Sequence, residues 1–566
     1  MPSLFRKRNR GSLRNREIDP DEIFLDSKNL PEFDQDQFEG RLERPLSVKS
    51  VVGLGIVFVA ILLAFVGKIS ILQIKDGEVY AQKSADNSLR QTVIFPERGI
   101  IYDRNGVSLA WNIPPDSDIE YSKRQYAAIP GMGHVVGYVR YPSKDANGFY
   151  FQAKYDGVDG VEKIYNDALA GANGLKIVET DALGHIQSES QLEPPSDGQS
   201  LALSIDSRVQ EELYNKIKSL ALSIGFSGGA GVIMDVRTGE IITAVSYPGY
   251  DSNIMSDRAK VKEIQGYIND SQDPFLDRTI NGLYTPGSIV KPFIALAALK
   301  EGVIDPSKQI LSTGSISIPN PYNPKLQSVF KDWRPQGYVD MRHAIAVSSD
   351  VYFYEVGGGF QDQPGLGIDN IDKYMKLFGF GTVSPSNPFL DMSGTVPSPG
   401  WKAENFPGDP WRIGDTYNTS IGQYGWEVTP MQVARAVSAI ANGGTLIEPT
   451  FIKAFSDKPS TGIQLPFSPD QIAVVQQGMR LAVTGGIAVG LNIPQVAVAA
   501  KTGTAELGAI KKYVNSWVEG FFPYDHPRYA FAAIMEKGPY SNTVGALYVM
   551  RGLFEWMAAN TPEYFK

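Results

Sequence analysis

The chain has 566 residues, a formal net charge of -9 at pH 7, no cysteine and only four histidines. This length predicts at least two folded domains, and the acidic balance argues against a nucleic-acid-binding protein, which usually carries an extensive basic face. The absence of cysteine excludes disulfides, thiolate metal sites and a cysteine nucleophile, and so few histidines argue against a histidine-rich metal centre. We therefore expect neither a metal nor a cofactor.

The N-terminal segment, residues 1–47, begins basic and turns acidic, with few apolar residues and no clear periodicity. This composition predicts a disordered, solvated tail. A binding motif for a cytosolic partner is the alternative, and the sequence does not identify such a partner.

Residues 48–72 are predicted to form a transmembrane anchor. Residues 51–67 are uncharged and rich in Val, Ile, Leu, Phe and Ala, and with their apolar flanks they reach the roughly 20 residues that a membrane-spanning helix needs. A buried soluble helix and a cleaved signal peptide are the alternatives, but no small-residue cleavage site follows closely. The basic residues that precede the run favour a cytoplasmic N-terminus. We thus expect a single-pass membrane protein with its N-terminus in the cytoplasm and the bulk of the chain outside it.

Residues 73–205 are predicted to form an extended, mostly β pedestal domain. Residues 98–107 indicate a strand, an Asn105-Gly106 turn and a returning strand. Short apolar runs with Gly and Pro continue beyond this hairpin, for example at residues 157–163. No nucleophile-and-base arrangement emerges in this region, so we interpret it as a spacer or interaction platform.

Residues 206–566 are predicted to form an α+β domain. Apolar residues recur at helical spacing over residues 209–220, and two apolar strands follow at 230–234 and 241–245, joined by a plausible hairpin turn. A further helix is predicted from Thr429 to a stop at Asn442-Gly443. Helix, paired strands and then many helices form an α+β pattern, not alternating βαβ units.

The first chemical motif of this domain is Ser288-Ile289-Val290-Lys291. A second Ser-x-x-Lys copy occurs at Ser328 and Lys331, so the spacing alone does not choose between them. Ser288 follows a Thr-Pro-Gly turn and leads into an apolar helical run, and this context predicts a serine at the first turn of a helix, with Lys291 on the same face. Its backbone amide would lack a helical partner and could donate to an oxyanion.

Two further motifs follow in order. Ser348-Ser349-Asp350 lies within an apolar run, where polar side chains need a reason, although a satisfied helix cap is an equally good interpretation of that motif alone. Lys501-Thr502-Gly503-Thr504 follows a small-residue strand at 496–500, and Gly503 would allow close approach of a substrate backbone. An edge strand of this kind can bind an extended peptide.

In this order and context, the three motifs resemble those of class B penicillin-binding proteins, the monofunctional peptidoglycan D,D-transpeptidases. Within this class, Asp350 and residues 411–418 and 421–423 resemble those of the elongation-type PBP2 (MrdA-like) branch. Division-type relatives usually carry Asn at the position of Asp350. The resemblance implies a penicillin-binding, serine β-lactamase-like transpeptidase domain on a pedestal of the dimerisation type. The other matching segments are residues 98–106, 239–240, 247–248, 284–288, 411–418 and 421–423.

The resemblance also implies a role for each residue. Ser288 would be the nucleophile, Lys291 the base, Ser348 a proton relay, and Asp350 would order that side of the site, while burial and the charge of Lys501 would lower the pKa of Lys291. The implied set is completed by Lys501 and Thr502 as carboxylate ligands, Gly503 and Thr504 as substrate-binding residues, and the amides of Ser288 and Thr504 as the oxyanion hole.

The implied partners are stem peptides ending in D-Ala-D-Ala, β-lactams, a SEDS-type glycosyltransferase (RodA-like) and other elongation-complex proteins. The alternatives are a division-type (FtsI-like) transpeptidase, a β-lactamase, a membrane-bound β-lactam sensor, a D,D-carboxypeptidase and a catalytically silent scaffold. A β-lactamase would not need the anchor and pedestal. A bifunctional enzyme is disfavoured because no room remains for a glycosyltransferase domain.

Overall fold

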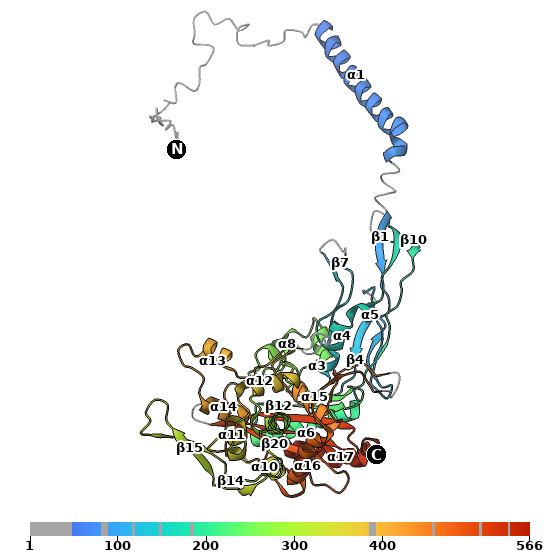
Figure 1. The fold of residues 1–566 in the computed structure, drawn as a ribbon. Helices are drawn as coiled ribbons and strands as arrows, with labels where there is room; N and C mark the ends of the chain where they lie inside the picture. The colour runs from blue at the N-terminus through green and yellow to red at the C-terminus, as the bar shows by residue number, and fades with distance from the viewer. Residues whose placement is uncertain are drawn as a thin grey trace, which may run out of the picture. The chain divides into compact units, whose positions relative to one another are not determined.

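The structure is a computed structural model that describes residues 48–80, 89–115, 119–145, 150–180, 186–383, 392–454, 459–508, 512–541 and 544–566. The tail at residues 1–47, predicted to be disordered, lies outside these residues. The chain divides into two compact units, residues 1–90 with 179–186, and residues 91–178 with 187–566 (Figure 1). Each unit is described by itself.

In the first unit, the apolar run forms the helix α1 (Val48–Ser70), which continues as the π-helical turn η3 (Ile71–Lys75). Together they make a 28-residue candidate membrane span, none of which is buried in the protein. An apolar helix satisfies its own backbone hydrogen bonds, as a hydrocarbon environment requires, while its side chains remain free to face lipid. The predicted helix over residues 48–72 is confirmed.

The second unit begins with the pedestal, which is built from small sheets. A four-stranded sheet has the order β11-β2-β3-β4, a three-stranded sheet has the order β1-β9-β10, and two-stranded pairs are formed by β5 with β8 and by β6 with β7. The strands are β1 (Leu89–Ile94), β2 (Ile101–Tyr102), β3 (Ser108–Ile113), β4 (Lys123–Tyr126), β5 (Val139–Arg140), β6 (Ser143–Lys144), β7 (Tyr150–Gln152), β8 (Asp156–Gly157), β9 (Gly174–Thr180), β10 (Ile186–Glu193) and β11 (Leu201–Ala202).

The predicted hairpin is present, but its turn is longer than an Asn-Gly pair. Tyr102 is in register with Ser108, and the Asp103 carboxylate accepts hydrogen bonds from the amides of Asn105 and Val107, each at 2.8 Å. Gly106 adopts a φ of 85°, which glycine tolerates without strain. An aspartate side chain therefore closes this turn.

The pedestal also contains three short helices, α3 (Gly133–Val136), α4 (Gly160–Ile164) and α5 (Asn166–Ala170). The segment 157–163, read from sequence as part of a β module, is therefore half helical. Its apolar residues follow a helical turn that buries Val161 and brings Glu162 inward, and both residues are fully buried.

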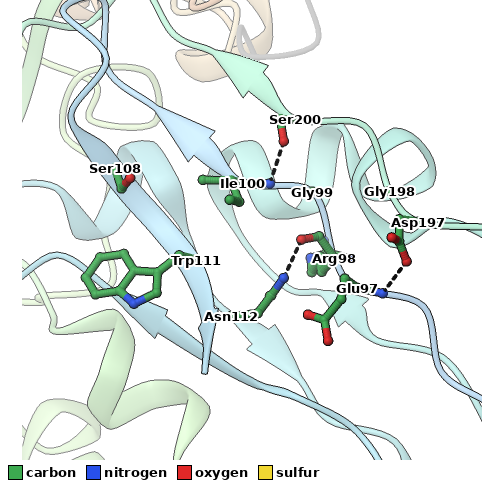
Figure 2. A pocket seen from close by; sticks show the side chains of 10 residues that line it. All are labelled: Glu97, Arg98, Gly99, Ile100, Ser108, Trp111, Asn112, Asp197, Gly198 and Ser200. Carbon is green, nitrogen blue, oxygen red and sulfur yellow. Dashed lines mark hydrogen bonds between the residues drawn. The ribbon is translucent and has the colours of Figure 1, made fainter. Parts of the chain in front are cut away.

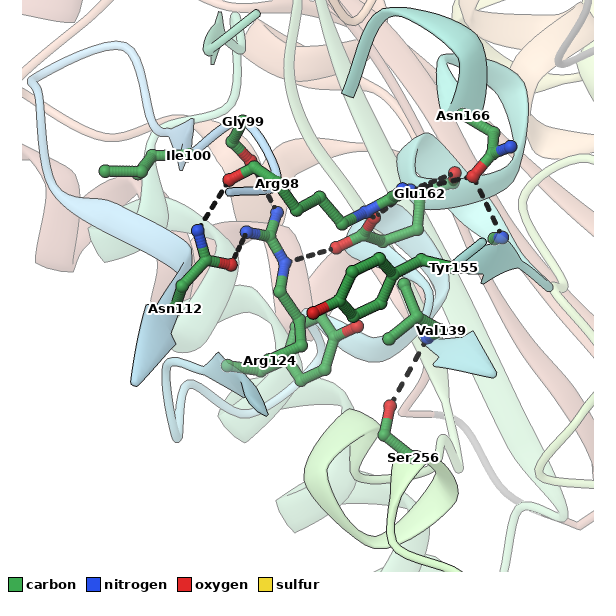
Figure 3. A network of polar contacts seen from close by, with 12 residues as sticks. Arg98, Gly99, Ile100, Asn112, Arg124, Val139, Tyr155, Glu162, Asn166 and Ser256 are labelled. Atoms are coloured by element: carbon green, nitrogen blue, oxygen red, sulfur yellow. Dashed lines mark hydrogen bonds and ion pairs between the residues drawn. The ribbon is translucent and has the colours of Figure 1, made fainter. Parts of the chain in front are cut away.

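Helix α4 brings Glu162 between two arginines (Figure 3). Its carboxylate accepts from Arg98 Nε at 2.6 Å and from Arg124 Nε at 2.8 Å, and all three side chains are fully buried. Asn166 accepts from Arg98 and Asn112 accepts from Arg124, so the network joins two strands to two helices.

A pocket of about 730 Å³ adjoins this network (Figure 2). The amide of Glu97 donates to Asp197 at 2.9 Å, and the amide of Ile100 donates to the Ser200 hydroxyl at 3.0 Å. Trp111 lines the same pocket. These bonds tie the start of the pedestal to its last segment, and thereby close the domain before the chain enters the larger domain.

The larger domain contains an antiparallel five-stranded sheet with the order β13-β12-β22-β21-β20 (Figure 1). Side chains alternate between its two faces: those on one face pack with α6 and α17, and those on the other with α9 and α15. The predicted helix at 209–220, the hairpin strands, the helix beginning after Thr429 and the α+β arrangement are confirmed. The sheet strands are β12 (Gly228–Asp235), β13 (Ile241–Tyr247), β20 (Ala499–Leu507), β21 (Tyr513–Phe522) and β22 (Tyr529–Pro539).

The helices surround this sheet, and two of the three chemical motifs lie at the start of a helix or between two helices. They are α6 (Ser207–Ile224), α7 (Ser252–Ser256), α8 (Val261–Ile268), α9 (Lys291–Lys300), α10 (Met341–Val347), α11 (Asp350–Gly358), α12 (Ile368–Leu377), α13 (Pro399–Asn405), α14 (Ile413–Ser420), α15 (Pro430–Ala441), α16 (Pro469–Gly485) and α17 (Ala546–Asn560). Three small strand pairs complete the domain: β14 (Ile310–Ser312) with β17 (Gly337–Val339), β15 (Ser315–Pro319) with β16 (Gln327–Lys331), and β18 (Thr445–Leu446) with β19 (Ile463–Gln464).

Candidate active site

Ser288 lies at the start of a helix, as predicted. It belongs to a short 3-10 turn, Gly287–Val290, that leads directly into α9. Gly287 has a φ of 58°, its amide donates to the Gly422 carbonyl at 2.9 Å, and a Cβ on it would lie 2.8 Å from the carbonyl oxygen of Thr504. Only glycine fits this position, and the close fit presses the serine turn against strand β20.

The second Ser-x-x-Lys copy has a different geometry. Ser328 and Lys331 lie on strand β16, and the Ser328 hydroxyl accepts from the Asn320 amide at 3.1 Å. Residues three apart on a strand point to opposite faces, so this serine and lysine cannot act on one another. The structure thus removes the rival that spacing left open.

Lys291 is fully buried and its ammonium contacts the second motif. It donates to Asp350 Oδ1 at 2.6 Å, to the Ser348 carbonyl at 2.9 Å and to Ser348 Oγ at 3.2 Å. In the described part of the chain, the Ser288 side chain makes no hydrogen bond. Lys291 therefore lies one helical turn from Ser288 but is held by the Ser348–Asp350 segment.

Ser348 occupies the junction between α10 and α11. It has a left-handed backbone, with φ 58°, and caps the C-terminus of α10, while Ser349 caps the N-terminus of α11 by accepting from the Tyr352 amide. Ser348 Oγ also accepts from Lys501 Nζ at 2.8 Å. One hydroxyl thus bridges the two buried lysines, as a proton relay requires.

Lys501 lies within strand β20 and not at the end of a strand, because β20 begins at Ala499 and continues through the motif. Beyond Ser348, its ammonium donates to the Thr502 carbonyl at 2.6 Å. Strand β20 is an edge strand of the sheet, and an edge strand can bind an extended peptide. A Cβ on Gly503 would lie 2.8 Å from the Pro286 carbonyl, so the close approach that Gly503 permits here is that of the serine turn.

The electrostatic environment acts strongly on Lys501. Burial, and then the positive charge of Lys291, lower the pKa of Lys501 well below its ordinary value. Glu519 and Asp350 act in the opposite direction. The predicted lowering of the pKa concerned Lys291, and for that residue it stays a prediction.

Sequence reasoning missed Asp332, which follows the rival copy. This buried carboxylate accepts from Ser349 Oγ at 2.7 Å, from Ser312 Oγ at 3.0 Å and from the Val351 amide at 3.2 Å, all at Oδ2. It thereby fixes the segment on which Ser348 and Asp350 lie. In the sequence, Asp332 is simply an aspartate between two strand-forming segments. Such a position does not reveal which distant residues it contacts.

We expect Asp332→Asn to slow acylation by a β-lactam about 10-fold to 100-fold. If the amide nitrogen replaces Oδ2, it meets three donors, and if it replaces Oδ1, it meets the Trp333 amide, so at least one buried donor loses its acceptor. Such a loss costs about 1–3 kcal/mol and displaces the attached serine. The second-order acylation rate constant measures the effect. Asp372→Asn, which alters a partly exposed ion pair with Lys376 outside these motifs, should retain the parental rate.

A second residue missed from the sequence is Glu519, which lies in register with Lys501 on the neighbouring strand. It is fully buried, and neither of its carboxyl oxygens has a hydrogen-bond partner among the described residues. In the sequence, Glu519 interrupts the apolar run 517–522, and a charged residue in such a run indicates a buried group that needs a partner.

The segment 411–423 also supports the turn that carries Ser288. Trp411 Nε1 donates to Thr416 Oγ1 at 2.8 Å, and Asp415 accepts from the buried Lys402 at 2.6 Å, which fixes helix α14. Beyond α14, the carbonyl of Gly422 accepts from the amide of Gly287. Within the described residues, no group of three or more His, Asp or Glu side chains is placed to hold a metal ion.

Comparisons with known proteins place this geometry in context. The family described as "Penicillin binding protein transpeptidase domain" matches residues 229–549, a little over half of the chain, and the "Penicillin-binding Protein dimerisation domain" matches residues 117–203. Among curated relatives, "Peptidoglycan D,D-transpeptidase MrdA" of Haemophilus influenzae is 27% identical over an alignment of 571 residues. The alignment covers 82% of this chain and 85% of the relative.

Two solved structures are also similar. Pseudomonas aeruginosa PBP2 in complex with WCK 5153 has a TM-score of 0.68 and 29% identity, covering 83% of this chain and 97% of that one. The Helicobacter pylori complex of PBP2 with MreC has a TM-score of 0.68 and 25% identity, covering 83% and 99%. Both similarities include the pedestal as well as the sheet domain.

Proposed function

Because this chain belongs to the penicillin-binding protein transpeptidase family, we propose that it is a peptidoglycan D,D-transpeptidase that cross-links stem peptides during cell-wall elongation. The observation that carries this proposal is the meeting of Ser288, Lys291, Ser348 and Lys501 beside the open edge of β20. It brings a nucleophile at a helix start, two buried amines and a peptide-binding edge to one place.

The reaction begins with attack of Ser288 Oγ on the carbonyl carbon between the two terminal D-alanines of a stem peptide. Lys291, neutral at the moment of attack, accepts the serine proton, and the amides of Ser288 and Thr504 donate to the oxyanion of the tetrahedral intermediate. The close contact of Gly287 with Thr504 supports this assignment, because it brings the two amide-bearing segments together.

Collapse of the intermediate breaks the peptide bond and leaves an ester on Ser288. Ser348, which bridges the two lysines, passes a proton to the departing D-alanine, and Asp350 orders Lys291 through their ion pair. An amine from a neighbouring stem peptide then attacks the ester, which forms the cross-link and restores the serine. No metal or cofactor takes part in these steps.

Substrate recognition depends on the positive charge of Lys501 and on the edge of strand β20. Lys501 and Thr502 hold the terminal carboxylate, while Gly503 and Thr504 line the path of the extended peptide on β20. β-Lactams, which mimic the D-Ala-D-Ala end, acylate Ser288 and leave slowly.

The elongation assignment rests on Asp350, on segment 411–423 and on relatives named MrdA and PBP2. We infer that a SEDS-type (RodA-like) glycosyltransferase supplies the glycan polymer, and that an MreC-like protein joins the assembly, as in the Helicobacter pylori complex. Helix α1 would anchor the protein in the cell membrane, with the basic N-terminus in the cytoplasm and the catalytic domain outside.

The full-length protein, reconstituted with a partner polymerase and lipid-linked precursor, should produce cross-linked dimers of stem peptide. Digestion of the product and mass spectrometry of the fragments measure the dimers, and penicillin should abolish them. A reconstitution with a verified polymerase that yields polymer without dimers would favour the silent scaffold. Depletion from cells should give rounded cells, and filaments would point to the division-type alternative.

A further inference from the structure

Glu519 is a buried carboxyl group that the proposed mechanism does not use. It lies on β21 directly opposite Lys501 on β20, so the two side chains share one face of the sheet. Its side chain is fully buried, and in the described chain both carboxyl oxygens lack a hydrogen-bond partner. Burial of an unpaired carboxyl group is costly, so its presence opposite an active-site lysine calls for a physical reason.

Of the charged groups around Lys501, two are already paired with each other. Three charged groups act on it: Lys291 from α9, Asp350 from α11 and Glu519 from β21. Asp350 already forms a 2.6 Å ion pair with Lys291. Without Glu519, the two buried lysines would therefore share one carboxylate.

Charged residues on the other packed elements have partners of their own. On α15, Arg435 pairs with Glu448, and on α16, the Arg480 guanidinium donates to a backbone carbonyl at 2.8 Å. On the adjoining strand β22, Glu536 pairs with Arg278. The charge that acts on Glu519 is that of Lys501.

The charge of each group opposes the effect that burial has on the pKa of the other. Burial raises the pKa of Glu519 well above its ordinary value, and the charge of Lys501 acts in the opposite direction. Burial also lowers the pKa of Lys501, which the charge of Glu519 offsets in part. The two titrations are therefore coupled, because the charge of each group favours the ionised form of the other.

We propose that Glu519 is a positioning residue that supplies the buried negative charge which keeps Lys501 an ammonium. In that form Lys501 donates to Ser348 and attracts the terminal carboxylate of the substrate. This role rests on the proposed function, because it concerns the same site. The requirement for a second carboxylate comes from the packing of two lysines against one hydroxyl, and it is met from the neighbouring strand.

The first test is the pH profile of β-lactam acylation by the full-length protein. The alkaline limb reports the loss of the Lys501 proton. Glu519→Gln removes the negative charge but keeps the shape of the side chain. It should move the alkaline limb of the acylation profile to a pH about one to two units lower. The loss of acylation rate should therefore be several-fold greater at high pH than at low pH. Glu519→Val, which suits a buried strand, should move the limb in the same direction and is the second variant if the amide folds poorly.

The second test needs no activity. In the wild type, the folded pair holds the same single proton as the unfolded chain near neutral pH, so the pair adds little pH dependence. In Glu519→Gln, Lys501 loses its proton in the folded state at a lower pH than in the unfolded state. The unfolding temperature of the variant, relative to wild type, should therefore rise as pH increases from about 7 to 10.

Glu355→Gln is the matched control for both tests. Burial raises the pKa of Glu355 to about 7, so this substitution also removes a perturbed carboxyl group. Its stability relative to wild type should rise only up to about pH 7 and be flat above it, and its alkaline acylation limb should stay in place.

The outcomes separate the two proposals. Uniform loss of acylation at every pH, or an unchanged alkaline limb in both Glu519 variants, would overturn the role of Glu519 while leaving the transpeptidase intact. A wild-type protein that forms no penicillin adduct would count against the proposed function. The stability profile would still decide the pairing of Glu519 with Lys501, and a profile parallel to wild type above pH 7 would refute it.

Discussion

Replacing Ser288 with alanine should abolish the covalent adduct between the full-length protein and fluorescent penicillin. Alanine lacks the Oγ that opens the β-lactam ring, and Ser348, the hydroxyl that both buried lysines contact, is assigned to proton relay and not to nucleophilic attack. Removal of a serine nucleophile typically lowers turnover by about 10⁶-fold, so labelling should fall to background. Fluorescence of the protein band after gel electrophoresis measures it.

Ser328→Ala is the control for this experiment, because it alters the same motif on strand β16. Its labelling should equal that of the wild type, since Ser328 and Lys331 point to opposite faces of the strand. Mass spectrometry of the labelled peptide should place the adduct on the segment that contains Ser288. Labelling that survives Ser288→Ala, or an adduct mapped to Ser328, would falsify the assignment of the nucleophile.

The parts of this site that the sequence predicted depend on local signals. The helical spacing of the apolar residues after Ser288 predicted a serine at a helix start, and the structure places Ser288 there, whereas Ser328 lies on strand β16. The helix beginning after Thr429 was also predictable, because a Thr cap, a Pro at the first helical position and a Gly after the end mark both termini.

The parts that the sequence did not predict depend on contacts between distant segments. The partners of Asp332 include Ser312 and Ser349, and Glu519 meets Lys501 only because β20 and β21 pair in that register. Local periodicity carries no information about such pairings. A buried polar residue in an apolar run signals that a partner exists, but the fold alone identifies it.

Ser348 illustrates an intermediate case. Its apolar surroundings predicted a polar group with a purpose, and a helix cap and a catalytic role were both open. The structure shows that the two interpretations are compatible, because Ser348 ends α10 while its hydroxyl bridges Lys291 and Lys501. The sharp turn between α10 and α11 brings the hydroxyl to the lysines.

Replacing Glu162 with glutamine should strongly destabilise the pedestal. The carboxylate stands between Arg98 and Arg124, and all three side chains are fully buried (Figure 3). Glutamine keeps the shape but leaves two buried guanidinium groups without a counter-charge, and loss of one member of a buried ion pair costs about 3–5 kcal/mol. Denaturant unfolding of the full-length protein in detergent, followed by limited proteolysis of the pedestal, measures the loss.

Glu189→Gln provides a control with the same chemical change in the same domain. Glu189 pairs with Lys176 at 2.9 Å, but its side chain is 58% exposed, and a surface pair contributes at most about 1 kcal/mol. Equal effects of the two substitutions would show that the Arg98–Glu162–Arg124 cluster does not stabilise the pedestal. Ser288 should still form its penicillin adduct in the Glu162 variant at low temperature, because the core between the sheet and helices α6 and α17 contains no pedestal residue. A selective loss of pedestal protection with labelling retained would therefore locate the effect in the charged cluster itself.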